Sequence, residues 1–362
     1  QIFQKYGCDN INLSVIRNDQ PMNISIKPIK SCDDEKYRAG IWVRDSSAGI
    51  GTLTFIDSET NTFAGLGHGI CDIDKSRADQ CANEHFCKAF YDFSKVLSDP
   101  SVTSVHICTP HFLHHSMAIE AARAGKEVIL EKPAAINLEK FHELENELRG
   151  NKVCVMLQNR MNIAIQAFKK IIDDDISLGK LIGGFAALTW HRDAEYYKSG
   201  EWRGRWDTEG GGVLINQAVH LIDLISYLAG DIKTVRGHIS NNTLQDVIEV
   251  EDTADAIFTL AKNVNVCYYA TNGYSSNLPM RLELQFENAL LRYADDVLYR
   301  VDKSGAKIIA KNDDKHPGKD YWGDSHTVVI DNFYNGGKFP TIADAKNSMT
   351  ALFKFYESAK NN

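Results

Sequence analysis

Apolar and polar residues alternate along the first 70 residues with the period of β-strands. Residues 11–29 alternate on either side of an Asn18-Asp19-Gln20-Pro21 turn, and residues 40–70 continue in short runs rich in Gly, Thr and β-branched side chains. This pattern is typical of β-hairpins. Since no stretch before residue 75 has a helical period, we expect the N-terminal part of the chain to be β-rich.

From residue 75 the pattern changes to helices that alternate with short apolar strands. Such an alternation predicts βαβ units and a parallel sheet. The predicted helices cover residues 75–86, 115–125 and 137–150, and the predicted strands cover residues 104–110, 126–133 and 152–160.

Beyond Gly179 long alternating strands dominate, which predicts an open, mostly antiparallel sheet with a helical layer. A long apolar helix is expected at 213–230, and two more helices near 325–335 and 343–359. The predicted strands are 181–191, 252–261, 264–274, 280–286 and 289–295.

The composition narrows the class of protein. The net charge of −8 argues against a nucleic-acid or anionic-membrane partner, because phosphate groups are bound by concentrated basic surfaces. No apolar run approaches the roughly 20 residues that span a bilayer. The eight cysteines form neither Cys-x-x-Cys pairs nor clusters with zinc spacing. We therefore expect a cytoplasmic protein with reduced thiols and no metal site.

Two parallel strands are predicted to end side by side in proline turns. One strand ends in Glu131-Lys132-Pro133 and its neighbour in Thr109-Pro110. Proline restricts the preceding residue to an extended conformation, and open α/β sheets bind ligands at the carboxyl ends of their strands. Lys132 is therefore a candidate site residue, with an ordinary surface lysine as the alternative.

The second candidate group begins at three glycines, residues 210–212. Asn216 and His220 are four residues apart on the predicted helix, so they share one face, and Asp223 could orient the imidazole. Histidine exchanges protons near neutral pH. The alternative is a histidine that is only part of the core.

These motifs together resemble the glucose-fructose oxidoreductase / inositol dehydrogenase (Gfo/Idh/MocA) family, from about Cys71 to the C-terminus. The matching residues are Cys71-Asp72-Ile73-Asp74, Thr109-Pro110 with His114, Glu131-Lys132-Pro133, the stretch 210–223, and Tyr321-Trp322-Gly323 with His326.

The resemblance implies an NAD(P)-dependent oxidoreductase that transfers hydride between the nicotinamide and a sugar, cyclitol or related polyol. Lys132 and His220 would be catalytic, with Asn216 as a third member that binds or orients, because an amide cannot relay a proton where many relatives have Asp. Asp72 would hold the adenosine ribose and favour NAD over NADP. The remaining assignments are cofactor binding by Thr109, Pro110, His114, Glu131 and Lys132, and substrate binding by Tyr197, Trp202, Arg203, Asn216, His220 and His326.

Other details follow from the same resemblance. Tyr197, Trp202 and Arg203 resemble a substrate-lid segment, with solvated loop as the alternative. A dimer or tetramer is expected by resemblance.

A complete family member would carry a strand, a Gly-x-Gly-x-x-Gly turn and a helix ahead of Asp72. Gly49-Ile50-Gly51 has the expected spacing from Asp72, which follows Gly51 by 21 residues. The residues between them alternate like a hairpin, however, and cannot supply the helix whose N-terminus binds pyrophosphate. We therefore predict that NAD binds weakly or not at all.

Residues 1–74 instead resemble a fragment of the stage IV sporulation protein B serine peptidases. The match includes Ala39-Gly40-Ile41-Trp42-Val43-Arg44-Asp45-Ser46, residues 48–55, and Leu66-Gly67-His68-Gly69-Ile70. His68 matches that family's catalytic histidine, but the nucleophilic serine and its acid are missing, so peptidase activity is not expected. Both families can carry a tetrapeptide like that at 71–74, which suggests a recombined or misassembled reading frame.

The predicted fold is α/β: an incomplete Rossmann-like parallel sheet, an α+β domain with a large, mostly antiparallel sheet, and an N-terminal β-rich fragment. The alternative to a dehydrogenase is a catalytically idle chimera. The expected segments are 1–31 (PDZ-tail-like), 32–70 (truncated peptidase-like), 71–150 (incomplete NAD(P)-binding domain) and 151–362 (substrate and oligomerisation domain).

Overall fold

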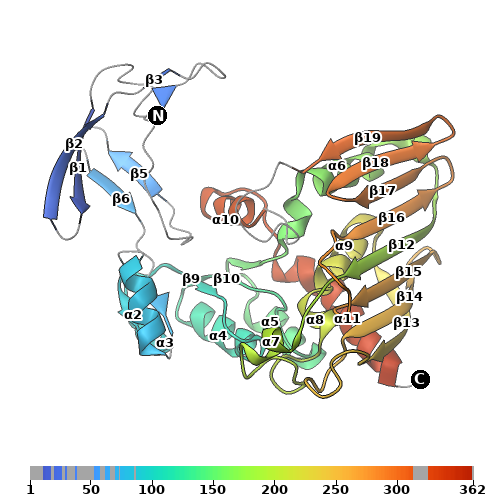
Figure 1. The fold of residues 1–362 in the computed structure, drawn as a ribbon, viewed down its shortest axis with the longest axis horizontal. Coiled ribbons are helices and arrows are strands. Elements are labelled where there is room, and N and C mark those ends of the chain that lie inside the picture. Colours follow the sequence, from blue (N-terminus) through green and yellow to red (C-terminus); the bar gives the residue numbers. More distant parts are fainter. Residues whose placement is uncertain are drawn as a thin grey trace. The chain divides into compact units, whose positions relative to one another are not determined.

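The computed structural model describes most of the chain from residue 70 onwards and several strands before it (Figure 1). His68 and Tyr321-Trp322-Gly323 lie outside the described residues. The chain divides into two compact units, residues 1–89 and 90–362. The described ranges are 11–17, 20–26, 29–30, 37–38, 53–57, 62–65, 70–72, 74–84, 87–312 and 325–360.

Consecutive strands of the first unit pair in antiparallel fashion, as the alternating pattern predicts. The pairs are β1 (Ile11–Arg17) with β2 (Gln20–Ile26), β3 (Ile29–Lys30) with β4 (Tyr37–Arg38), and β5 (Leu53–Asp57) with β6 (Thr62–Gly65). The β5–β6 pair confirms the hairpin predicted between the Gly49-Ile50-Gly51 motif and Asp72.

The predicted βαβ alternation is confirmed. The chain runs through β7 (Ile70–Cys71), α2 (Lys75–Glu84), β8 (Ala89–Phe90), α3 (Phe93–Ser98), β9 (Ser104–Ile107), α4 (His111–Arg123), β10 (Glu127–Leu130), α5 (Leu138–Glu147) and β11 (Val153–Val155). β10 lies between β9 and β11 and is parallel to both. α4 begins four residues before the predicted start, because the fixed φ of Pro110 lets the helix start directly after it.

The strands of this half form two separate sheets. β7 pairs with β8, whereas β9, β10 and β11 form a three-stranded sheet.

An eight-stranded sheet dominates the second unit (Figure 1). Its order is β13-β14-β15-β12-β16-β17-β18-β19, and among these neighbours only β12 and β15 pair in parallel. The mostly antiparallel sheet is thus confirmed, although β13, β18 and β19 had not been predicted. The strands are β12 (Leu181–Thr189), β13 (Ile232–Ser240), β14 (Thr253–Leu260), β15 (Asn265–Thr271), β16 (Arg281–Phe286), β17 (Leu290–Ala294), β18 (Val297–Asp302) and β19 (Gly305–Lys311).

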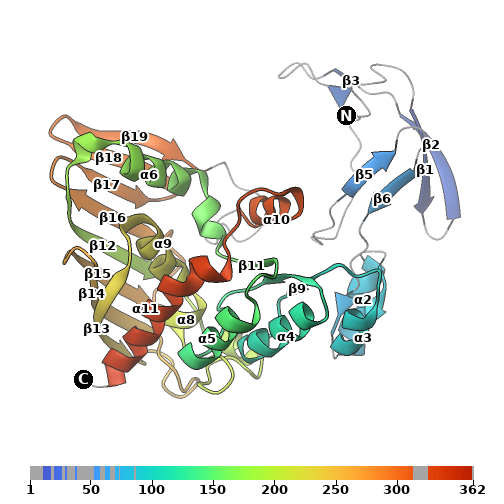
Figure 2. The ribbon, with the colours of Figure 1, turned by 180° about the vertical axis from the view of Figure 1, so that it is seen from behind.

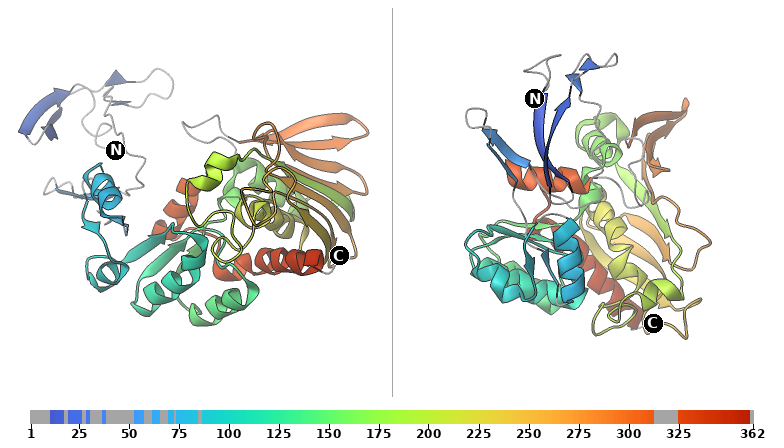
Figure 3. Two further views of the ribbon diagram at one scale, coloured as in Figure 1. Left: turned by 60° about the horizontal axis from the view of Figure 1, so that its bottom comes forward. Right: turned by 60° about the vertical axis from the view of Figure 1, so that its left-hand side comes forward.

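Helices cover one face of this sheet, as Figure 2 shows in a view turned by 180° from that of Figure 1. α6 (Ile163–Asp174), α9 (Val219–Ala229) and α11 (Ile342–Lys360) pack there, and Figure 3 shows the layering in two further views. The core includes Phe258 and Tyr268 from the sheet and Phe355 from α11. The remaining elements are η1 (Gln158–Met161), η2 (Ile176–Leu178), α7 (Ala194–Lys198), α8 (Val213–Asn216) and α10 (His326–Asn335).

The long helix predicted at 213–230 is wrong as a single element. The chain forms α8, then breaks at Gln217 and Ala218, and continues as α9. At the break the Ala218 N–H donates to the carbonyl of Val213, five residues back, instead of four. The helices predicted near 325–335 and 343–359 are confirmed as α10 and α11.

Candidate active site

Lys132 follows directly after β10, at the carboxyl end of a parallel strand, as predicted. Its Nζ donates to the backbone carbonyl of Asn216 (2.7 Å) and to Asn216 Oδ1 (3.2 Å). Burial lowers the pKa of Lys132, and the nearby Glu131 and Glu209 carboxylates oppose that effect. An ammonium group whose pKa is lowered in this way is a suitable acid or base partner for a hydroxyl group.

His114 holds the two proline turns together. Its Nδ1 lies 2.8 Å from the carbonyl oxygen of Pro133, and its Nε2 lies 2.8 Å from that of Thr109. The side chain is 1% exposed. The two strand ends therefore lie side by side, as the sequence predicts, but both imidazole nitrogens face the backbone.

The three glycines let the backbone pass close to other segments of the same chain. A Cβ at Gly212 would lie 1.8 Å from the carbonyl oxygen of Glu251, and one at Gly211 would lie 2.0 Å from the hydroxyl of Tyr356. Their role in this structure is therefore the close packing of α8 against neighbouring chain.

Glu251 anchors the start of α8. Its carboxylate accepts hydrogen bonds from the Gly212 N–H (3.0 Å), the Leu214 N–H (3.0 Å) and the Tyr356 hydroxyl (2.8 Å). Its backbone carbonyl accepts from the Val213 N–H. Burial raises the pKa of Glu251 to about 7. This residue fixes the short helix that carries Asn216 to Lys132.

His220 lies on α9 and is 6% exposed. Burial, followed by the charges of Lys132 and His326, holds the pKa of His220 well below its ordinary value, so the imidazole is neutral. His220 Nδ1 has no hydrogen-bond partner within the described part of the chain. The charges of Lys132 and His326 thus act on His220.

Asp223 does not orient the imidazole, contrary to expectation. Its two carboxylate oxygens each accept a 2.7 Å hydrogen bond from Arg160 of η1. Because the helix breaks between Asn216 and His220, these two residues do not lie on one face of a continuous helix, as had been predicted. Asp223 therefore serves the packing of η1 against α9.

In the segment after β12, Tyr196 rather than Tyr197 faces Asn216. The Tyr196 hydroxyl accepts hydrogen bonds from Arg203 (2.6 Å) and from the side-chain amides of Gln217 (3.2 Å) and Asn216 (3.3 Å). Tyr197 is instead buried in a cluster with Leu244, Ile248 and Val250.

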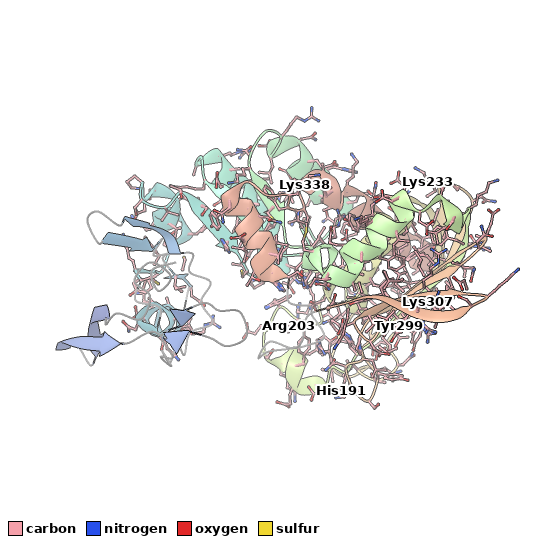
Figure 4. The ribbon with its side chains drawn as sticks, turned by 90° about the horizontal axis from the view of Figure 1, so that it is seen from above. His191, Arg203, Lys233, Tyr299, Lys307 and Lys338 are labelled. Atoms are coloured by element: carbon pink, nitrogen blue, oxygen red, sulfur yellow. The ribbon has the colours of Figure 1, made fainter. Side chains whose placement is uncertain are left out.

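Trp202 and Arg203 do lie near the other site residues. The Arg203 guanidinium stacks on the rings of Tyr196 and Trp202, and Trp202 packs against His111. Figure 4 labels Arg203 and His191, which both come from this segment.

Glu209 is a site residue to which the sequence had given no role. It is 1% exposed, and its carboxylate accepts hydrogen bonds from the Gly204 N–H (2.5 Å) and from Asn216 Nδ2. Burial raises the pKa of this carboxyl group. The only signal for it was its position directly before the three glycines. His111 was also missed; its Nδ1 lies 2.9 Å from the Glu209 carbonyl oxygen.

Asp72 belongs to the first unit. Its Oδ1 accepts hydrogen bonds from the Asp74 N–H (2.8 Å) and from Arg77 (3.0 Å), which form a local turn at the end of β7. The second carboxylate oxygen has no hydrogen bond that the described residues show.

A parallel βαβ half, a mostly antiparallel sheet with a helical layer, and Lys132 bonded to Asn216 at a strand end define an α/β protein. Residues 59–159 match the family model described as "Oxidoreductase family, NAD-binding Rossmann fold", and residues 165–292 match the "GFO/IDH/MocA C-terminal domain". Over these stretches the chain belongs to the Gfo/Idh/MocA oxidoreductase family. The prediction of this family, whose cofactor domain binds NAD, is thus confirmed.

The curated relatives are similar over part of their length. Levoglucosan dehydrogenase of Pseudarthrobacter phenanthrenivorans is 31% identical over 153 residues, which cover 41% of this chain and 38% of that protein. The scyllo-inositol 2-dehydrogenase (NAD(+)) of Bacillus subtilis is 32% identical over 180 residues, 48% of this chain and 49% of that protein. The chain thus spans about half or less of these two relatives.

Solved structures share the fold over more of the chain. Levoglucosan dehydrogenase in complex with NADH and levoglucosan superposes with a TM-score of 0.72 at 22% identity, covering 81% of this chain and 88% of that one. The WlbA dehydrogenase of Bordetella pertussis, in complex with NADH and UDP-GlcNAcA, has a TM-score of 0.68 at 26% identity, covering 81% and 87%.

Two searches of the described residues found nothing. No group of three or more His, Cys, Asp or Glu side chains in the described ranges is arranged to hold a metal ion. Among the helices that the structure describes, none is long and apolar enough to cross a bilayer.

Proposed function

We propose that this chain carries the site of an NAD-dependent oxidoreductase that acts on a sugar, cyclitol or related polyol. The observation that carries the proposal is Lys132, held at the end of β10 by Asn216, with the neutral imidazole of His220 in the same electrostatic environment. Family membership and the dehydrogenase relatives support the same reaction class.

The residues around Lys132 fit the nicotinamide end of the cofactor. NAD, when bound, supplies the hydride acceptor. Lys132 would hydrogen-bond the reacting hydroxyl group, and His220 would take up or return its proton. Asn216 would orient Lys132, and Trp202 and Arg203 would contact the substrate. His114 would keep the Thr109-Pro110 and Lys132-Pro133 turns together.

The residues ahead of Asp72 do not fit the pyrophosphate end. Where a strand, glycine turn and helix would supply oriented N–H groups, β5 and β6 form an antiparallel hairpin. We infer that NAD binds weakly. Calorimetric titration with NADH should show no saturation in the micromolar range, and a low-micromolar affinity would contradict this inference.

Substitution of the two reacting residues tests the proposed chemistry. NAD reduction with levoglucosan or scyllo-inositol as probe, followed by absorbance, should fall at least 100-fold in Lys132→Ala and in His220→Ala, since each removes a proton-transfer partner. Lys152→Ala, a lysine that precedes the neighbouring strand β11 and pairs with the partly exposed Glu127, is the matched control and should keep its activity. Unchanged turnover in either site variant would exclude the assignment.

The second candidate is the catalytically idle chimera. The antiparallel pairing of β5 and β6 favours it, since a chain that forms a hairpin in this region lacks the unit that binds phosphate. Sequencing the contiguous genomic DNA around codons 65–80 from one clone tests it. If an uninterrupted oxidoreductase reading frame leads into codon 71 in place of the present residues, the junction is an artefact. No turnover together with no NADH binding would favour the idle chimera.

A further inference from the structure

The side-chain amide of Asn216 lies between an ammonium group and a carboxylate. Asn216 Oδ1 accepts from Lys132 Nζ, whereas Asn216 Nδ2 donates to Glu209. An amide offers a hydrogen-bond acceptor at one end and donors at the other. The carboxylate must meet the donor end and the ammonium the acceptor end, so Glu209 and Lys132 together fix which way the amide points.

Glu209 is built into this position. It is 1% exposed, and its other hydrogen bond comes from the Gly204 backbone N–H. A buried carboxylate is stabilised only by the donors that surround it, and here one of these is the amide that touches Lys132. Neither Lys132 nor Glu209 makes an ion pair within 4 Å with another described side chain.

The other charges that act on Lys132 are Glu131, which is its chain neighbour, and the cations Arg203 and Arg192. Glu131 follows β10, and among the described residues it makes no hydrogen bond with Asn216, so it cannot orient the amide. Glu209 is the carboxylate connected to Lys132 through a side chain.

We propose that Glu209 is a positioning residue that acts on Lys132 through the side-chain amide of Asn216. Its carboxylate fixes the orientation of the amide, and the amide oxygen in turn holds the ammonium group. The inference rests on the proposed function only in taking Lys132 as the reacting lysine.

Exchange of the two side chains tests the proposal. The double variant Glu209→Gln/Asn216→Asp places the carboxylate at position 216 and an amide at position 209. The carbonyl of this amide can accept from the Gly204 N–H, and its NH₂ can donate to Asp. The readout is the pH dependence of Lys132 acetylation by acetic anhydride, followed by mass spectrometry on the full chain, since only the unprotonated amine reacts. This readout requires neither NAD nor substrate.

Glu209→Gln should lower the apparent pKa of Lys132, so that its labelling at a fixed pH below that pKa becomes about tenfold faster. The double variant should restore the wild-type profile. Asp207→Asn, an exposed carboxylate two residues from Glu209 that pairs with Arg205, is the matched control and should change nothing. If Glu209→Gln leaves the profile unchanged, or if the exchange does not restore it, the proposal is overturned.

Asn216→Leu keeps the test decisive if Glu209→Gln does not fold, which near-ultraviolet circular dichroism would reveal. It removes both ends of the amide at nearly constant volume and should also speed the labelling of Lys132. An unchanged profile in this variant would overturn the proposal as well. If the labelling of Lys132 changes as expected but the chain transfers no hydride, the proposed function is rejected and the role of Glu209 stands.

Discussion

Asp223 and His220 are neighbours in sequence that serve different partners. Asp223 is 3% exposed in its side chain and meets Arg160, which is 8% exposed, through two 2.7 Å hydrogen bonds. Each charge is removed from water, so each depends on the other. The geometry assigns Asp223 to stability and leaves the proton chemistry to His220.

Asp223→Asn should therefore destabilise the protein by about 3 kcal/mol, because it leaves the Arg160 charge buried and only partly compensated by the more distant Asp344. Urea unfolding measures this loss. Asp173→Asn, which removes an exposed i,i+4 pair with Lys169, is the control and should cost less than about 1 kcal/mol. Equal losses in both variants would contradict the assignment.

Sequence reasoning at the residue scale succeeded where a side chain follows from its place on a strand. The position of Lys132 at the end of a parallel strand was predicted correctly, because the proline after it fixes the strand end. Glu209 and Tyr196 were missed because their role depends on a contact with Asn216 from a distant turn, and no spacing in the sequence encodes that contact. Tyr197 was chosen in place of its neighbour since the two cannot be told apart by pattern.

The short helix α8 depends on one buried carboxylate, that of Glu251. Burial raises its pKa to about 7 from an ordinary 4.5. The folded protein therefore keeps this proton to a higher pH than the unfolded chain does. The contribution to stability is complete below pH 4.5, and it is lost as the pH rises through about 7.

We predict that the free energy of unfolding falls between pH 5 and pH 8 by up to roughly 3 kcal/mol on account of Glu251. Glu251→Gln cannot titrate, so it should lack this part of the pH dependence. Urea unfolding of both proteins at several pH values gives the comparison, and the difference between their slopes isolates Glu251 from all other groups. Parallel slopes would show that the carboxyl group is not buried as the structure has it.

The elements themselves were predictable to different degrees. The βαβ alternation and the helices near the C-terminus followed from periodicity alone. The break between α8 and α9 did not, because residues 213–230 contain no glycine or proline before Gly230, and the break shows only in the hydrogen bond from the Ala218 N–H to the Val213 carbonyl. The partly exposed strands β18 and β19 carry little apolar alternation, and they were found only as the edge of the larger sheet.

At the scale of the whole molecule, α6, α9 and α11 pack on one face of the eight-stranded sheet, and within the described ranges no helix packs on its other face. The alternating burial along β15 places Cys267 and Tyr269 on that face, next to Phe185 and Ala187 of β12. Tyr269 is 38% exposed. The strand register flanks this short apolar strip with Glu283 and Arg281 of β16 and with Asp255 of β14. An apolar strip with a polar rim is typical of a surface that pairs with another protein.

We predict that two copies of the chain pair through this face, because an isologous contact covers it in both copies at once. Tyr269→Glu places a charge there and should shift sedimentation velocity from dimer or larger towards monomer, with the dissociation constant raised at least tenfold. Lys338→Glu, which also changes one surface charge but lies in the loop after α10, should leave the assembly unchanged (Figure 4). A wild-type protein that sediments as a monomer at tens of micromolar would rule out the pairing.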